Sequence, residues 1–185
     1  MPHIVGIAGS LRRHSFNLGV LNAARDLMPV GATLSVHTLA DIPLYNADEE
    51  AADGLPPAVV ALKDAVAQAD GVLLATPEYN NGIPGVFKNA IDWMSRPTDD
   101  IARIFRNRPF AVIGASPGGF GTILAQDAWL PVLRTLGTKP WFNGRLMISG
   151  AGQLFDGNGG LTDQATRERL REFLAGFTSF AAAGA

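Results

Sequence analysis

The side chains best suited to chemistry lie in a polar loop that follows the first apolar run of this 185-residue chain. Four residues of the loop supply hydroxyl, amide and guanidinium groups that can donate hydrogen bonds to a phosphate: Ser10, Arg12, Ser15 and Asn17. A helix is predicted to begin here, and the first turn of a helix has unpaired N–H groups and a partial positive charge. The loop therefore predicts a site for a single terminal phosphate, with an ordinary helix cap and solvated arginines as the alternative.

Two common nucleotide-binding motifs are absent from this loop. The segment Gly6-Ile7-Ala8-Gly9 lacks the glycine spacing of G-x-G-x-x-G, and no Gly-Lys-Ser or Gly-Lys-Thr sequence follows it. The predicted phosphate site is therefore neither a dinucleotide fingerprint nor a P-loop.

Predicted strands and helices alternate along the chain. Apolar runs predict strands over residues 3–8, 72–76, 110–115 and 140–148, and an alternating pattern predicts another over 33–38. Apolar residues at helical spacing predict helices over 18–28, 56–66, 86–94, 122–136 and from 162 onward, the last with Thr162 as its cap. Residues 39–53 are expected to form a long connection. Pro131 predicts a kink or an early break in the fourth helix.

This alternation favours a parallel sheet with helices on both faces. Five strands and about five helices predict an α/β fold, a flavodoxin-like three-layer sandwich with strand order 2-1-3-4-5, in one domain over residues 1–185. In such a sheet the ligand lies beyond the carboxyl ends of the strands, where the strand order reverses. The three polar loops of the chain follow the first, third and fourth strands, so we expect them to share that edge.

Composition and charge narrow the class of protein. A formal charge of −2 argues against a nucleic-acid partner, and no segment is long and apolar enough to span a membrane or resembles a signal peptide. The chain has no cysteine, which excludes disulfides and thiolate ligands. Its histidines, His3, His14 and His37, lack the spacing of metal ligands, so no metal site is predicted. A cytoplasmic protein fits this composition best.

A second motif follows the third predicted strand. It runs Thr76-Pro77-Glu78-Tyr79-Asn80-Asn81-Gly82-Ile83-Pro84-Gly85 and continues into Lys88-Asn89-Ala90-Ile91-Asp92-Trp93. Two prolines stiffen this loop, and Gly82 and Gly85 are expected to allow unusual backbone angles and a close approach to a ligand. A turn of no functional importance is the alternative interpretation of such a cluster.

Together the two motifs resemble the NADPH-dependent FMN reductase family, and in particular its bacterial chromate and quinone reductases. The matching residues are Gly9-Ser10-Leu11-Arg12, Ser15 and Asn17 in the first loop, and Pro77-Glu78-Tyr79-Asn80, Pro84-Gly85 and Lys88 to Trp93 in the second. Asp41-Ile42-Pro43-Leu44-Tyr45-Asn46 is similar to the same branch. The resemblance covers residues 3–120 and becomes weaker after Gly121.

The resemblance implies a bound FMN and three groups of site residues. Ser10, Arg12, Ser15 and Asn17 would bind the phosphate of FMN. Pro77, Glu78, Tyr79 and Asn80 would bind the isoalloxazine ring mainly through backbone groups, with a structural role for the Glu78 carboxylate. Ser116, Gly118 and Gly119 would approach the ring or the ribityl chain.

The implied activity is transfer of hydride from NADPH or NADH, through FMN, to a small electron acceptor. Quinones are the expected acceptors, with chromate, azo compounds and free flavin as similar candidates. No catalytic side chain is predicted, because the cofactor carries the chemistry. Arg13 and Arg96 are candidates for contact with the 2′-phosphate of NADPH.

The resemblance also implies a homodimer or homotetramer with the flavin near a subunit boundary. The helix with Val86, Ile91, Trp93 and Met94 is the candidate interface.

Two other functions compete with this interpretation. Gly114-Ala115-Ser116-Pro117-Gly118 matches the G-x-S-x-G motif of serine hydrolases, but every histidine precedes the serine, and Pro117 lacks the N–H required for the oxyanion hole. The second competing function is that of a non-catalytic FMN-binding electron carrier or sensor of the flavodoxin type. Carriers tend to be strongly acidic, and this chain is not.

Overall fold

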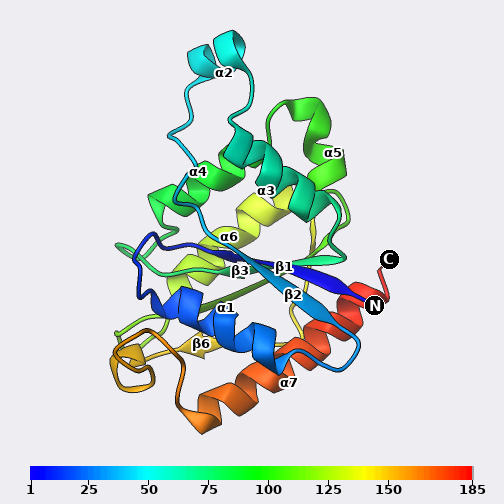
Figure 1. The fold of residues 1–185 in the computed structure, drawn as a ribbon. Coiled ribbons are helices and arrows are strands. Elements are labelled where there is room, and N and C mark those ends of the chain that lie inside the picture. The colour runs from blue at the N-terminus through cyan, green and yellow to red at the C-terminus, as the bar shows by residue number, and fades with distance from the viewer. Residues whose placement is uncertain (185) are drawn as a thin grey trace.

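A computed structural model describes residues 1–184 and shows a six-stranded parallel sheet between two layers of helices (Figure 1). The strand order is β2-β1-β3-β4-β5, and β6 also pairs with β4. The strands are β1 (His3–Ala8), β2 (Thr33–His37), β3 (Gly71–Ala75), β4 (Pro109–Ala115), β5 (Lys139–Pro140) and β6 (Met147–Ile148). The predicted fold class and strand order are confirmed.

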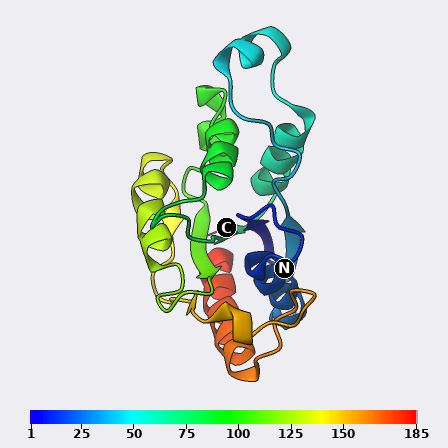
Figure 2. The same cartoon turned by 90° about the vertical axis from the view of Figure 1, so that its left-hand side faces the viewer.

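The helices cover the two faces of the sheet unequally. They are α1 (Phe16–Leu27), α2 (Ala47–Asp53), α3 (Pro57–Ala67), α4 (Gly85–Met94), α5 (Ile101–Ile104), α6 (Ile123–Thr135) and α7 (Gln164–Ala182), with 3-10 turns at Thr98–Asp100 and Ala151–Gln153. Helices α1 and α7 lie on one face, and α3, α4, α5 and α6 lie on the other (Figures 1 and 2). Helix α2 stands away from both layers, and none of its residues is buried.

Successive residues of the central strands enter opposite cores. Ile4 packs with α1 and α7, whereas Val5 packs with α3 and α4 on the other face. In β3, Leu73 packs in the core with α1 and α7, and Leu74 packs in the core on the other face. Side chains along a strand alternate between faces, so a sheet covered on both sides needs an unbroken apolar run. This is why the central strands are apolar apart from His3 at the start of β1.

The register of the strands places three loops at one edge. Ala8, the last residue of β1, is opposite Ala75, the last residue of β3, and Ala75 is opposite Ile113 of β4. The loops that follow these strands therefore begin side by side, as the sequence predicted.

The predicted strand over 140–148 is wrong in its middle part. Only its two ends pair with β4, as β5 and β6. Between them the chain leaves the sheet, and Trp141 packs edge-on against Phe173 of α7 with ring centroids 4.9 Å apart. Gly144 lies close to the same indole, because a Cβ there would be 2.4 Å from Trp141 Cη2. Trp141 and Leu146 of this segment fill the core instead of extending the sheet, whereas Phe142 is exposed.

Two details of the predicted helices also differ. Helix α6 passes through Pro131 without a break, because Pro131 lies on the exposed side and the carbonyl that loses its hydrogen bond belongs to the exposed Asp127. The cap of α7 is Asp163 and not Thr162. The Asp163 carboxylate accepts a hydrogen bond of 2.8 Å from the Thr166 N–H. Hydrogen bonding from the Thr166 side chain, and then from this N–H, holds the pKa of Asp163 below its usual value.

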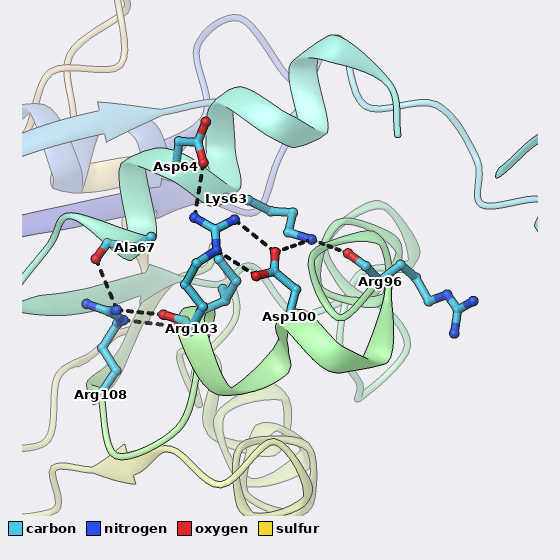
Figure 3. Close-up of polar contacts among 8 residues, drawn as sticks. Lys63, Asp64, Ala67, Arg96, Asp100, Arg103 and Arg108 are labelled. Carbon is cyan, nitrogen blue, oxygen red and sulfur yellow. Dashed lines mark hydrogen bonds and ion pairs between the residues drawn. The ribbon is translucent and has the colours of Figure 1, made fainter. Parts of the chain in front are cut away.

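A network of charged side chains attaches α5 to α3 (Figure 3). Lys63 has only 1% of its side chain exposed, and its Nζ lies 2.9 Å from Asp100 Oδ2 and also donates to the carbonyl of Arg96. Arg103 holds the same carboxylate at 2.6 Å and reaches Asp64 at 3.1 Å. The hydrogen bond from Arg103, followed by the one from Lys63, keeps the pKa of Asp100 far below its usual value.

Candidate functional site

The first loop leads into α1 through a side-chain cap. The Ser15 Oγ accepts the Leu18 N–H at 3.4 Å, so Ser15 is the cap of α1. Ser10, which is 5% exposed, accepts the Arg12 N–H at 3.3 Å. These bonds bend the chain into a turn whose backbone precedes the positive end of a helix.

Donors without acceptors collect at this turn. Across residues 1–184 the backbone N–H groups of Phe16 and Asn17 donate no hydrogen bond to the protein. Arg12 and Arg13 are exposed and form no ion pair with any described residue, and the Arg12 guanidinium lies 5.7 Å from the centre of the Phe16 ring. A set of free donors and cations with no carboxylate among them suits an anion.

Asn17 binds the end of β4 through its side chain. Its side chain is 2% exposed, and its Nδ2 donates to the Ala115 carbonyl at 2.9 Å while its Oδ1 accepts the Ala115 N–H at 2.9 Å. Both polar atoms are thus bound to the end of β4, and the second N–H of Nδ2 and the backbone N–H of Asn17 are left for a phosphate. The side chain fixes the first loop to the third.

The second loop ends in a tight turn. Tyr79 and Gly82 exchange backbone hydrogen bonds of 3.2 and 3.1 Å, with Asn80 (φ 50°) and Asn81 (φ 62°) in the left-handed region between them. The expectation that Gly82 and Gly85 supply the unusual backbone angles is wrong, because the two asparagines do so. Asparagine tolerates this conformation better than most residues.

The tyrosine of this turn reaches the first loop. Tyr79 is 46% exposed, and its hydroxyl lies 3.4 Å from the Ser10 Oγ. Pro77, two residues earlier, is buried under the loop. An exposed aromatic side chain thus stands beside the predicted phosphate site, where it can flank a planar ring.

Glu78 points away from the turn and toward α6. Its Oε2 accepts the N–H groups of Leu124 and Ala125, each at 2.9 Å. The carboxylate therefore has a structural role, as the sequence analysis expected.

The third loop exposes backbone beyond β4. Gly118 and Gly119 are exposed, and the Gly118 carbonyl accepts the Gly150 N–H at 3.1 Å. The Ser116 hydroxyl donates to the Gly121 carbonyl, and no histidine of residues 1–184 hydrogen-bonds to it. This serine lacks the base that a hydrolase nucleophile needs. The serine-hydrolase interpretation therefore has no geometric support.

The predicted site residues fall into one place, and their chemistry fits FMN. The residues predicted to bind the phosphate lie at the start of α1, the exposed Tyr79 reaches Ser10 among them, and the exposed Gly118 and Gly119 follow β4 at the same edge of the sheet. Cross-links through Asn17 and Tyr79 hold these loops together. No group of three or more His, Asp or Glu side chains is placed to hold a metal ion within residues 1–184. In the same range no helix has the length and apolar character needed to cross a bilayer.

Arg96 is bound to a carboxylate and follows the C-terminal end of α4, whereas the Tyr79–Gly82 turn precedes the first residue of that helix. Its Nε donates to Glu50 Oε2 at 2.9 Å, and this hydrogen bond lowers the pKa of Glu50. Glu50 also accepts the Tyr45 hydroxyl at 2.9 Å. Of the two arginines that were candidates for a 2′-phosphate, Arg13 is the one without an ion-pair partner in the described chain.

The candidate interface on α4 is mostly inside the chain. Ile91, Trp93 and Met94 are at most 2% exposed and pack within this one chain. A cavity of about 510 Å³ lies elsewhere, between α6 and residues 140–147, with the exposed Leu130 and Phe142 among its lining. Leu130 and Phe142 thus leave apolar surface exposed at this cavity, whereas the inner face of α4 is covered.

Comparison with known proteins identifies the family. The sequence model for NADPH-dependent FMN reductases matches residues 2–153. The chain is 42% identical to an NAD(P)H-dependent FMN reductase of Pseudomonas aeruginosa over 92% of this chain and 90% of that protein. It is 35% identical to a quinone reductase of Escherichia coli K12 over 96% and 94% of the two chains.

A solved structure agrees with this assignment. The flavoenzyme FerB of Paracoccus denitrificans, an NAD(P)H:(acceptor) oxidoreductase, superimposes with a TM-score of 0.86 at 32% identity, over 99% of this chain and 98% of that one. The chain belongs to the NADPH-dependent FMN reductase family.

Proposed function

We propose that this protein is an FMN-dependent NAD(P)H oxidoreductase that reduces quinones. The observation that carries the proposal is the cluster of free donors at the start of α1, cross-linked to an exposed tyrosine turn at the same sheet edge. Relatives that are 35–37% identical over more than 90% of this chain are named as reductases of quinones, including 2-hydroxy-1,4-benzoquinone. Chromate, azo compounds and free flavin are further acceptors to be tested.

Three groups of residues would hold the cofactor. Ser10, Arg12 and Ser15 would bind the phosphate together with the N–H groups of Phe16 and Asn17, while the Asn17 side chain positions the loop. Pro77, Glu78, Tyr79 and Asn80 would face the isoalloxazine ring mainly through backbone groups, and Ser116, Gly118 and Gly119 would approach it from the third loop. FMN, when bound, supplies the electron-transfer chemistry, and the protein binds and orients it.

The remaining features of the proposal concern the whole molecule. The chain would form a single domain and act in the cytoplasm, in keeping with its lack of cysteine. It would assemble as a homodimer or homotetramer, supported by the exposed Leu130 and Phe142 beside α6.

The visible spectrum of the purified protein tests this function. A yellow protein that loses its colour with NADPH or NADH under anaerobic conditions, and regains it with a quinone, supports the reductase. A yellow protein that responds to neither nicotinamide would be an electron carrier or a sensor. A colourless protein that binds no added FMN and oxidises no NADPH would refute the proposal.

Loss of a phosphate donor is expected to weaken FMN binding. Arg12→Ala and Ser15→Ala should each raise the Kd for FMN by about tenfold or more, because a hydrogen bond to a charged group contributes roughly 1.5–3 kcal/mol. Fluorescence titration of the apoprotein with FMN measures this change. Arg25→Ala, at the exposed far end of α1, is the matched control and should leave the Kd unchanged. Equal Kd values for all of these variants would exclude the first loop as the phosphate site.

A further inference from the structure

The start of α6 has no cap from its own sequence. Thr122 occupies the cap position but makes no side-chain hydrogen bond to the first turn. Its Oγ1 instead accepts from Gln126 Nε2 at 3.1 Å, and the residue is fully buried against Gly114. A Cβ at Gly114 would be 2.0 Å from Thr122 Oγ1, so this hydroxyl packs directly against the Gly114 backbone. The first N–H groups of α6 must find an acceptor elsewhere.

The acceptor is Glu78, which lies 46 residues earlier in the chain than Leu124. One oxygen of its carboxylate accepts the N–H groups of both Leu124 and Ala125 at 2.9 Å. A negative charge at this end of a helix is also favoured by the helix dipole. The contact joins the second loop to the residue pair that directly follows the third loop.

Resting on the proposed function, we propose that Glu78 is a positioning residue for the flavin site. Its carboxylate fixes the spacing between the loops that would contact the ring, and it does not itself touch the cofactor. The neighbours of Glu78 support this role, because Pro77 is buried and Tyr79 reaches Ser10 of the phosphate loop. Loss of the Glu78 contact would therefore free the second and third loops to move apart.

Two substitutions separate positioning from a charge effect on the flavin. Glu78→Ala removes both hydrogen bonds and should raise the Kd for FMN by about tenfold, because binding would then have to order the two loops at the expense of affinity. Glu78→Gln keeps an oxygen that can accept both N–H groups, so its Kd and its flavin reduction potential should stay close to those of the unmodified protein.

Asp163→Ala is the matched control, because Asp163 caps α7 with a carboxylate in the same way but lies outside the flavin site. It should lower the melting temperature about as much as Glu78→Ala and leave the Kd for FMN unchanged. Amide hydrogen exchange of the apoprotein gives a readout without cofactor. In Glu78→Ala, exchange at Leu124 and Ala125 should become faster.

The outcomes distinguish this inference from the proposed function. Failure of the unmodified protein to bind FMN would refute the function. If the protein binds FMN, an unchanged Kd in Glu78→Ala, or a Kd raised equally in Asp163→Ala, would overturn the positioning role. The positioning role would also be overturned if Glu78→Gln shifted the flavin reduction potential as far as Glu78→Ala does. The negative charge of Glu78 would then act on the flavin directly. Unchanged exchange at Leu124 in the apoprotein would refute the cap itself.

Discussion

Asn17→Leu is expected to lower the free energy of unfolding by about 3 kcal/mol and to abolish retention of FMN during purification. The leucine would leave the N–H and the carbonyl of Ala115 buried without partners, because Asn17 supplies both of their hydrogen bonds from a position 98 residues earlier. The first loop would lose its attachment to the end of β4, and the donors for the phosphate would no longer be held in place.

The measurement is denaturation in urea together with the flavin content of the purified protein. Asn22→Leu, at an exposed position of the same helix, is the control and should change neither quantity appreciably. Asn17→Asp should behave like the leucine variant, since a carboxylate can accept the Ala115 N–H but cannot donate to the Ala115 carbonyl. If Asn17→Leu were as stable as Asn22→Leu, the two hydrogen bonds of Asn17 would make no net contribution to the free energy of unfolding.

Asp100→Asn is expected to lower the free energy of unfolding by about 3 kcal/mol. The substitution leaves the charge of Lys63 without its carboxylate in a site where the side chain is 1% exposed. The double variant Lys63→Met/Asp100→Asn should recover much of this loss, because it removes the buried charge as well. Denaturation in urea at pH 7 measures the free energy of unfolding of the unmodified protein, of Asp100→Asn and of the double variant. A double variant less stable than Asp100→Asn would mean that Lys63 stabilises the fold without its partner.

The same carboxylate makes stability depend on pH. The pKa of Asp100 is lowered in the folded protein, so its contribution is complete above the ordinary carboxyl value near 3.8 and is lost as the pH falls below it. We expect the unmodified protein to lose stability more steeply than Asp100→Asn between about pH 5 and pH 2. Glu168→Gln, which disrupts an exposed pair with Arg171, is the control and should not change that slope. Parallel pH profiles for Asp100→Asn and the unmodified protein would contradict the assignment.

The central strands were predictable because each is buried on both faces and therefore reads as an apolar run. Residues 140–148 were not, because Trp141 and Leu146 give the same apolar signal whether they extend a sheet or fill a core beside it. Helix α2 was missed for the opposite reason. It has no apolar face, and its only signals were the Asn46 cap and an acidic first turn.

The location of the site was predictable from topology, since polar loops after the first, third and fourth strands must meet at one sheet edge. The roles of individual side chains were harder to predict. Asn17 and Glu78 lie in the motifs of the phosphate and flavin loops, yet their side chains bind backbone groups 98 and 46 residues away. Such partners follow from the three-dimensional packing and leave no trace in local spacing. Asn80 and Asn81 could have been recognised as a turn, because an Asn-Asn-Gly sequence favours left-handed angles.

The divided fifth strand affects how the protein behaves when it is concentrated. An exposed sheet edge is a template on which a second chain can add a strand, and such addition leads to aggregation. The edge strand next to β4 is β5, which offers little backbone for such pairing. It has only two residues, Lys139 and Pro140, and proline has no N–H to donate. At the opposite side, β2 presents five residues with no such protection. Self-association through added strands should therefore start at β2, and a proline or lysine placed there would suppress it.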